Sequence, residues 1–234
     1  MATHLEDGSW EIQGRRLGFP VRITEAAAAC ATYLVRTDRA RRLVEGTGLE
    51  LLSFAGRTPL FLALIDYRVN DLGDYDEAGV AFLARHRGRT GTYIHQLPVT
   101  QTFTMEAGRA LWGLPKWLGR AELAIDGRDA TCHLADDAGR HVLTAALRTL
   151  PGRLPWPVSG GVAALAPRDG EVLVSPVRAR LSGIRVGRSA TVVLGGGHAM
   201  ADELRALGLP RRPLLTTIVD HVAFEMDPAS AVGR

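Results

Sequence analysis

The residue of this chain whose type and surroundings best suit chemistry is Lys116, the one lysine among 28 basic side chains. It lies in the run Trp112 to Gly119 (WGLPKWLG), flanked by a proline and a tryptophan. On a surface, arginine replaces lysine easily, but arginine cannot be deprotonated in a protein. A lysine kept in apolar, aromatic surroundings is therefore a candidate nucleophile. The alternative is an ordinary side chain on a turn.

The chemistry expected of such an amine is Schiff-base formation with a carbonyl compound. An unperturbed lysine, with a pKa of about 10.4, is neutral roughly one time in a thousand at neutral pH. An apolar pocket disfavours the ammonium ion, so we expect burial to lower the pKa of Lys116. A purely structural alternative is that Lys116 follows a helix and interacts with its negative end.

Two carboxylates are candidates for moving protons, because carbinolamine dehydration and enamine protonation each need a positioned donor. One is Glu106, although it could only support the start of a helix, and the other is Glu77, which rests on the family resemblance described below. Arg109 could bind a substrate carboxylate through two hydrogen bonds, or pair with one of these glutamates. Trp112 and Trp117 are expected to line the pocket, although large aromatic side chains often belong to a plain core.

Most of the remaining sequence is typical of short strands separated by glycine and aspartate turns. The expected strands are 59–69, 79–84, 92–99, 120–125, 130–134, 141–150, 171–177, 179–186, 189–194 and 214–224. Prolines and glycines predict a loop over 151–170. Helices are expected at 38–45 and 105–112, capped by Asp38 and Thr104, and at 200–207, with Gly46, Gly113 and Gly208 as their stops. The 26 glycines suit a barrel or cone whose sheet bends tightly.

Five short motifs, in this order along the chain, resemble those of the acetoacetate decarboxylase-like superfamily. They are Arg36-Thr37-Asp38, Leu72 to Glu77 (LGDYDE), Tyr93-Ile94-His95, the segment from Arg109 to Gly119, and His198 to Ala201 (HAMA). The resemblance runs from about residue 32 to about residue 207. It implies that Lys116 forms the Schiff base and that Glu77 is an active-site carboxylate. Tyr93 is then expected to contact the substrate.

The resemblance also implies the fold and the setting. We expect a mainly β protein, built as an antiparallel closed cone or barrel with flanking sheets and a few short helices. It would form one domain over residues 1–234, with Lys116 inside the cone. No metal and no organic cofactor are expected. Family members assemble as oligomers, which implies a homo-oligomer.

Three departures from the family pattern bear on the reaction. The second lysine of the family motif is replaced by Trp117, its second glutamate falls on Leu62, and its arginine falls on Ala28. We therefore expect a lyase or aldolase–dehydratase acting on a small keto acid or ketone. The alternatives are decarboxylation of an acetoacetate-type β-keto acid, or a non-catalytic protein that binds a small ligand in the same fold.

Composition limits the other classes of function. The net charge is only +3, and the arginine runs at 36–42 and 85–89 have acidic neighbours, so no nucleic-acid partner is expected. No apolar run reaches the roughly 18 residues that cross a membrane. The histidines lack paired ligand spacing, and Cys30 and Cys132 match no zinc or redox motif. We expect a cytoplasmic protein.

Overall fold

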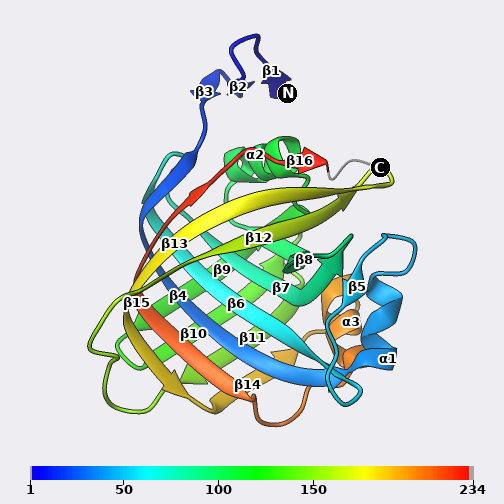
Figure 1. Ribbon diagram of the computed structural model, residues 1–234. Coiled ribbons are helices and arrows are strands. Elements are labelled where there is room, and N and C mark those ends of the chain that lie inside the picture. Colours follow the sequence, from blue (N-terminus) through cyan, green and yellow to red (C-terminus); the bar gives the residue numbers. More distant parts are fainter. Residues whose placement is uncertain (1, 232–234) are drawn as a thin grey trace.

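The computed structural model describes residues 2–231, and its largest feature is a closed β-barrel (Figure 1). Seven strands form the ring in the order β8, β12, β13, β15, β4, β6 and β7, and β7 returns to β8. Their bounds are β4 (Val21–Arg36), β6 (Arg57–Asn70), β7 (Tyr75–His86), β8 (Arg89–Val99), β12 (Val158–Arg168), β13 (Glu171–Gly187) and β15 (Leu215–Met226). All pairings in the ring are antiparallel except β8–β12. The expected mainly β closed barrel is confirmed.

A second sheet branches from β8. It contains β9 (Lys116–Asp126), β10 (Asp129–Asp136), β11 (His141–Arg148) and β14 (Ser189–Leu194). The first half of β8 pairs with β12, whereas Leu97 to Val99 pair in parallel with Lys116 to Leu118 of β9. One edge of β8 therefore serves both sheets. This junction places Lys116 in the barrel wall, directly opposite Leu97.

Short strands complete the sheets. The strands β1 (Ala2–His4), β2 (Trp10–Ile12) and β3 (Arg15–Leu17) form a separate antiparallel sheet. Figure 1 shows this sheet beyond the end of the barrel that α2 covers. The strand β5 (Glu50–Leu51) pairs with β7, and β16 (Ser230–Ala231) pairs with β13.

The helices are α1 (Thr37–Ala40), followed by the 3-10 turn η1 (Arg41–Leu43), α2 (Thr102–Trp112) and α3 (Ala199–Leu207). The expected glycine stops are confirmed for α2 and α3, because Gly113 and Gly208 both adopt the left-handed conformation there. The expected caps were wrong. The side chain of Gln101 accepts the Thr104 N–H, and α1 has no side-chain cap. No helix within residues 2–231 is long and apolar enough to cross a lipid bilayer.

The strand pattern differs from expectation in several parts, and the barrel strand β4 was not expected at all. The segment expected as a loop contains β12, and the two strands expected at 171–186 are one continuous strand, β13. Pairing between β12 and β8 is limited to Ala164 and Leu165 on the β12 side, so much of that edge of β12 is free. Free edges tolerate glycine and proline, and these residues had favoured a loop.

The alternation of side chains along the strands divides the interior into two cores. On β6, Leu62 and Leu64 point away from the barrel axis into a core shared with the second sheet. Tyr67 belongs to the other core, which lines the barrel beneath α2 and contains Phe103 and Trp112. From Pro59 to Tyr67, β6 is therefore buried or half-buried on both faces, whereas Val69 beyond it is 54 % exposed.

Asp76 supplies a testable consequence of this alternation. Its neighbours Tyr75 and Glu77 face the barrel interior, so Asp76 faces outward, where it is half-buried. Burial, together with Asp66 and Asp74, raises the pKa of its carboxyl group to about 6. The folded protein then binds this proton more tightly than the unfolded chain, whose aspartates titrate near 3.9. Its contribution to stability therefore falls as the pH rises from about 4 to about 6.

We predict that Asp76→Asn stabilises the protein by about 1–3 kcal/mol above pH 7 and has little effect near pH 4. Urea unfolding of both proteins at the two pH values measures the difference. Asp74→Asn, at an exposed position in the preceding turn, is the control and should change stability less. An equal effect of Asp76→Asn at both pH values would contradict the assignment.

Candidate active site

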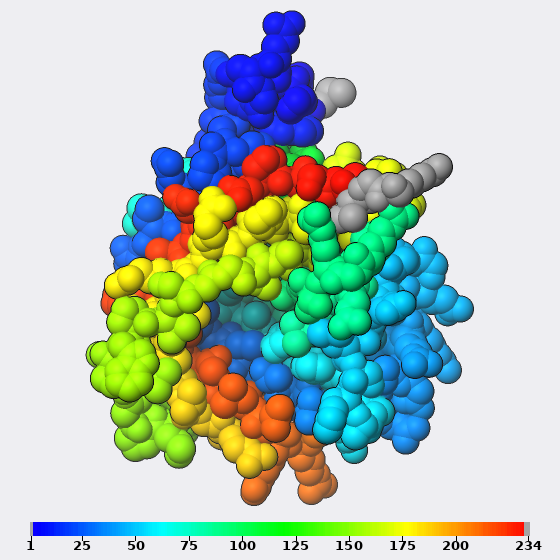
Figure 2. Space-filling model, in the orientation of Figure 1, coloured from blue at the N-terminus to red at the C-terminus, as the bar shows by residue number. Residues whose placement is uncertain are grey.

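The barrel encloses a cavity of about 290 Å³ beneath α2. It is lined by Ile23, Ile65, Tyr67, Leu72, Tyr75, Glu77, Thr92, Ile94, Leu97, Trp112, Leu114, Lys116, Val162, Ala164, Val177, Phe224 and Met226. Two of these residues carry a charge, Lys116 and Glu77, and most of the others are apolar. The lining includes Val162, which is 47 % exposed, so the cavity reaches the surface at β12. Figure 2 shows the surface hollowed between the yellow-green stretch around the start of β12 and the orange stretch of β15.

The charged pair lies against the barrel wall and is almost fully buried. Lys116 is 4 % exposed and Glu77 is 6 % exposed. The Lys116 Nζ lies 2.9 Å from Glu77 Oε2 and donates a hydrogen bond of 3.1 Å to Thr104 Oγ1. The second carboxylate oxygen of Glu77 accepts a hydrogen bond of 3.1 Å from the Tyr67 hydroxyl. The amine therefore has a proton acceptor in direct contact, and that acceptor is itself held in place.

An aromatic wall completes the surroundings of the amine. The Tyr75 ring lies 5.0 Å from Lys116 Nζ, within the range of a cation–π contact. Tyr67 and Tyr75 stack on each other with ring centres 4.4 Å apart. They are directly opposite in the β6–β7 pairing, which explains the contact.

The end of α2 directs Lys116 into this cavity. Gly113 adopts a left-handed conformation, and the Leu114 N–H returns to the Gly108 carbonyl at 3.1 Å. The side chain of Lys116 then runs back across Gly108. A Cβ atom at Gly108 would lie 2.5 Å from Lys116 Cδ and 2.7 Å from Cε, closer than real Cβ contacts come. The absence of a side chain at position 108 is therefore what makes room for the lysine.

Opposing influences act on the pKa of Lys116. Burial lowers this pKa, but the Glu77 carboxylate and Tyr75 raise it, and the result lies above the ordinary value. The expectation that burial alone would leave the pKa low was wrong, because the sequence did not place Glu77 in contact with the amine. Burial and Glu77 also raise the pKa of Tyr67 well above its usual range. Tyr67 therefore stays protonated and donates to Glu77.

The structure brings Glu77 and Trp112 to Lys116 but not Arg109 or Glu106. Trp112 lines the cavity, and its Nε1 donates to the Asp227 carbonyl at 2.9 Å. Arg109 is exposed, and its Nε donates to the backbone carbonyl of Lys116 at 2.6 Å. Arg109 therefore holds the backbone of Lys116 in place and does not line the cavity. Glu106 follows Thr104 by two residues, so it points to another side of α2, and it does not line the cavity.

Tyr93 and Trp117 also lie outside the cavity, on the other side of the barrel wall. The Tyr93 hydroxyl contacts His95 Nδ1 at 2.9 Å, and His95 Nε2 contacts Glu203 of α3 at 2.9 Å. Trp117 Nε1 donates to Gln96 at 3.0 Å, and Gln96 donates to the same Glu203 carboxylate. These side chains attach α3 to β8. The motif at 93–95 and the α3 segment are therefore linked by a structural contact.

Sequence reasoning missed three residues of the site, namely Thr104, Tyr67 and Tyr75. Two of them had a signal in the sequence. Tyr75 precedes Glu77 by two residues in a strand, and Thr104 precedes Gly108 by four residues in a helix, so each shares a face with a site residue. Tyr67 could be found only from the register between β6 and β7.

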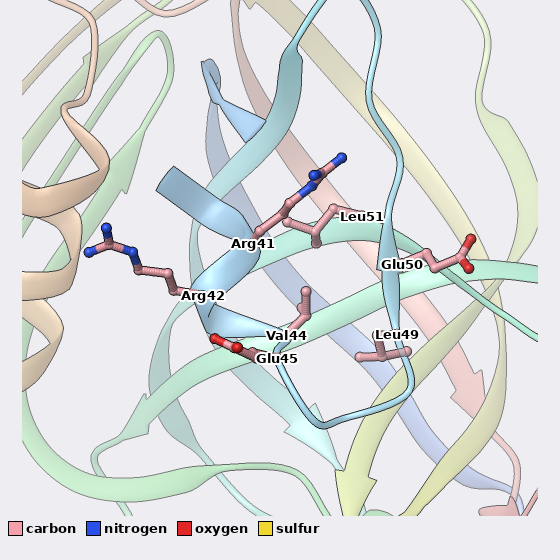
Figure 3. Close-up of a pocket in the computed structure, with 7 residues that line it drawn as sticks. All are labelled: Arg41, Arg42, Val44, Glu45, Leu49, Glu50 and Leu51. Carbon is pink, nitrogen blue, oxygen red and sulfur yellow. The ribbon is translucent and has the colours of Figure 1, made fainter. Parts of the chain in front are cut away.

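A larger hollow of about 620 Å³ lies outside the barrel, beside η1 and β5. Figure 3 shows that Arg41 and Arg42 of this hollow point in different directions, and that Glu50 points away from both. These charges do not converge on one point. Within residues 2–231, no group of three histidine, cysteine, aspartate or glutamate side chains could hold a metal ion. The barrel cavity is therefore the candidate active site.

Solved structures share this fold. Acetoacetate decarboxylase from Legionella pneumophila superposes with a TM-score of 0.71 and 16% sequence identity, covering 94% of this chain and 91% of that one. The enduracididine biosynthesis enzyme MppR, complexed with pyruvate, gives a TM-score of 0.68 and 19% identity, covering 93% and 92%. At this level of identity, the likeness shows the fold alone.

Sequence comparisons define the family. Acetoacetate decarboxylase of Acidiphilium cryptum is 35% identical over 54 residues, which are 23% of this chain and 22% of that protein. Acetoacetate decarboxylase 1 of Bradyrhizobium diazoefficiens gives the same values. These matches span about a fifth of the length of those relatives. The family model described as Acetoacetate decarboxylase (ADC) matches residues 12–158, more than half of the chain, and the chain therefore belongs to the acetoacetate decarboxylase family.

Proposed function

We propose that this protein is an enzyme that forms a Schiff base between Lys116 and a small keto acid or ketone. The observation that carries the proposal is the buried contact of 2.9 Å between Lys116 Nζ and Glu77 in a largely apolar cavity. We place the reaction among carbon–carbon lyases and aldolase–dehydratases, ahead of acetoacetate-type decarboxylation. From the family resemblance, we further propose a cytoplasmic homo-oligomer.

The first step follows from the contact within the pair. A proton passes from the Lys116 ammonium group to Glu77, which leaves a neutral amine beside a neutral acid. Displacement of water by the substrate favours this neutral pair, because an apolar environment penalises both charges. The raised pKa of Lys116 therefore does not prevent nucleophilic attack, because the proton moves within the pair and does not leave for solvent.

Imine formation then uses the same proton. The amine nitrogen bonds to the carbonyl carbon, and the carbonyl π electrons move to the oxygen. One proton from the nitrogen and the proton held by Glu77 convert that oxygen to water, which leaves as the iminium forms. Glu77 is again a carboxylate and faces the positive iminium. Tyr67 holds Glu77 by its second oxygen, and Thr104 orients the nitrogen.

The iminium accepts electrons from a bond at the neighbouring carbon, which is the step common to lyase, aldolase and decarboxylase chemistry. Departure of a proton, an aldehyde or carbon dioxide gives the enamine, and protonation or carbon–carbon bond formation consumes it. The solved complex of MppR with the condensation product of pyruvate and imidazole 4-carboxaldehyde supports aldol-type chemistry in this fold. The family name supports decarboxylation. A non-catalytic ligand-binding protein would trap no substrate.

We predict that borohydride reduction in the presence of a reactive carbonyl compound adds the mass of the reduced imine at Lys116. Mass spectrometry of the intact protein and its peptides measures the adduct. Lys116→Arg keeps the charge but supplies no free amine, so it should give no adduct and lose turnover while remaining folded. Normal turnover by a folded Lys116→Arg protein would exclude the Schiff-base mechanism.

We predict that Glu77→Gln lowers the pKa of Lys116 below its ordinary value. In the wild-type protein, burial lowers this pKa and Glu77 raises it, so removal of the carboxylate leaves burial dominant. The rate of Lys116 acylation against pH should have its midpoint above that of free lysine in the wild type and below it in Glu77→Gln. The variant should form the imine but turn over slowly. An unchanged midpoint would show that the pair is not coupled.

We predict that Gly108→Ala reduces the rate of imine trapping on the order of 100-fold, because the new methyl group displaces the Lys116 side chain. Alanine is the better helix former by about 1 kcal/mol, so helix propensity cannot explain the loss. Ala110→Gly, in the same helix, is the control and should destabilise the protein while keeping the rate of trapping. A wild-type rate in Gly108→Ala would contradict the placement of Lys116.

A further inference from the structure

The cavity around Lys116 is balanced in charge before any substrate enters. The ammonium group of Lys116 is matched by the carboxylate of Glu77 at 2.9 Å. The other polar side chains among its described lining residues are neutral, namely Tyr67, Tyr75, Thr92 and Trp112. When the iminium forms, its positive charge replaces that of the ammonium group and is again matched by Glu77. The reaction therefore needs no further negative charge.

Arginines close to the site are directed elsewhere. Arg109 is exposed and donates to the Lys116 carbonyl. Arg22 pairs with Glu225, and Arg178 pairs with Asp227, both on the outer surface of the barrel. None of these guanidinium groups lines the cavity. A substrate carboxylate in the cavity would thus meet no second cation among the described lining residues.

Burial of a carboxylate without a charged partner costs free energy, because the hydration free energy that the ion loses is larger than the free energy it gains from neutral surroundings. Apolar contacts are instead plentiful, from Ile23, Ile65, Ile94, Val177 and Phe224. The volume of about 290 Å³ equals that of about ten water molecules in the liquid. This exceeds the need of a three- or four-carbon keto acid.

The mouth of the cavity is also apolar. Val162 lines the cavity and is 47 % exposed, and two further apolar lining residues, Ala164 and Val177, are half-buried. Apolar side chains at the opening of a cavity favour apolar ligands.

Resting on the proposed function, we propose that the substrate is an uncharged ketone or aldehyde with an apolar body of about ten non-hydrogen atoms. Its carbonyl carbon bonds to Lys116, its oxygen leaves as water with the two protons described above, and its body lies along the apolar wall. Glu77 then removes a proton from the carbon next to the iminium, giving the enamine.

A matched pair of compounds tests the charge requirement. One compound is 4-phenylbutan-2-one, and the other is 2-oxo-4-phenylbutanoate, which has a carboxylate in place of the methyl group. Borohydride trapping at Lys116 is measured for each and divided by its trapping on a free lysine derivative, which removes the difference in intrinsic reactivity. We expect a normalised preference for the ketone of at least tenfold. In D2O, we also expect the enzyme to exchange the hydrogens beside the ketone carbonyl.

Substitution at the mouth tests the cause. Val162→Arg places a cation where its long side chain can reach solvent, so the fold tolerates it, and it should reduce the ketone preference at least tenfold. Val162→Leu is the matched apolar control and should keep the preference. Thr92→Arg, on the neighbouring strand, offers a second placement of the same charge if Val162→Arg does not fold.

The outcomes separate the two proposals. Preferred trapping of the keto acid, or equal trapping of both compounds, would overturn the uncharged substrate while leaving the Schiff base intact. An unchanged preference in a folded arginine variant would overturn the argument from charge. If neither these compounds nor pyruvate and acetoacetate gave an adduct at Lys116, the Schiff-base function would fail, and the substrate proposal with it.

Discussion

The rest of the site depends on one buried ion pair between Lys116 and Glu77. A charge of either sign alone at this depth would be severely destabilising, so each charge requires the other. The pair also explains why a raised pKa and a reactive amine are compatible, because a proton can move between partners that stay together. Tyr67 and Thr104 fix the two ends of this exchange, and the aromatic wall keeps it away from water.

The connections between the barrel strands bring the two members of this pair together. Glu77 comes from the inner face of β7, and Lys116 comes from the first position of β9, with β8 between the two strands. One edge of β8 pairs first with β12 and then with β9. The first residue of the second sheet, Lys116, therefore lies in the barrel wall. The helix α2 ends at Gly113 immediately before this point, and Gly108 leaves room for the lysine stem. The contact between Lys116 and Glu77 depends on all of these features together.

Sequence patterns predicted those parts of the molecule that depend on local or repeating information. The strands β9, β10 and β11, the glycine ends of α2 and α3 and the burial of Lys116 among apolar residues follow from periodicity, turn residues and composition. Contacts set by register could not be predicted. Tyr67 reaches Glu77 only because β6 pairs with β7 at Tyr75, and Trp117 points outward only because Lys116 points inward. The strand β12 was missed because a free edge allows residues that usually mark loops.

The junction between β8 and β9 has a consequence for how this chain can change over evolution. Three consecutive residues of each strand make the connection, and successive side chains point to opposite faces of the wall. Insertion or deletion of a single residue between Gly113 and Lys116 would exchange the two faces. An indole would then occupy the barrel, and the amine would lie in the layer between the sheets. The length of this short connection is thus as strict a determinant of chemistry as the lysine itself.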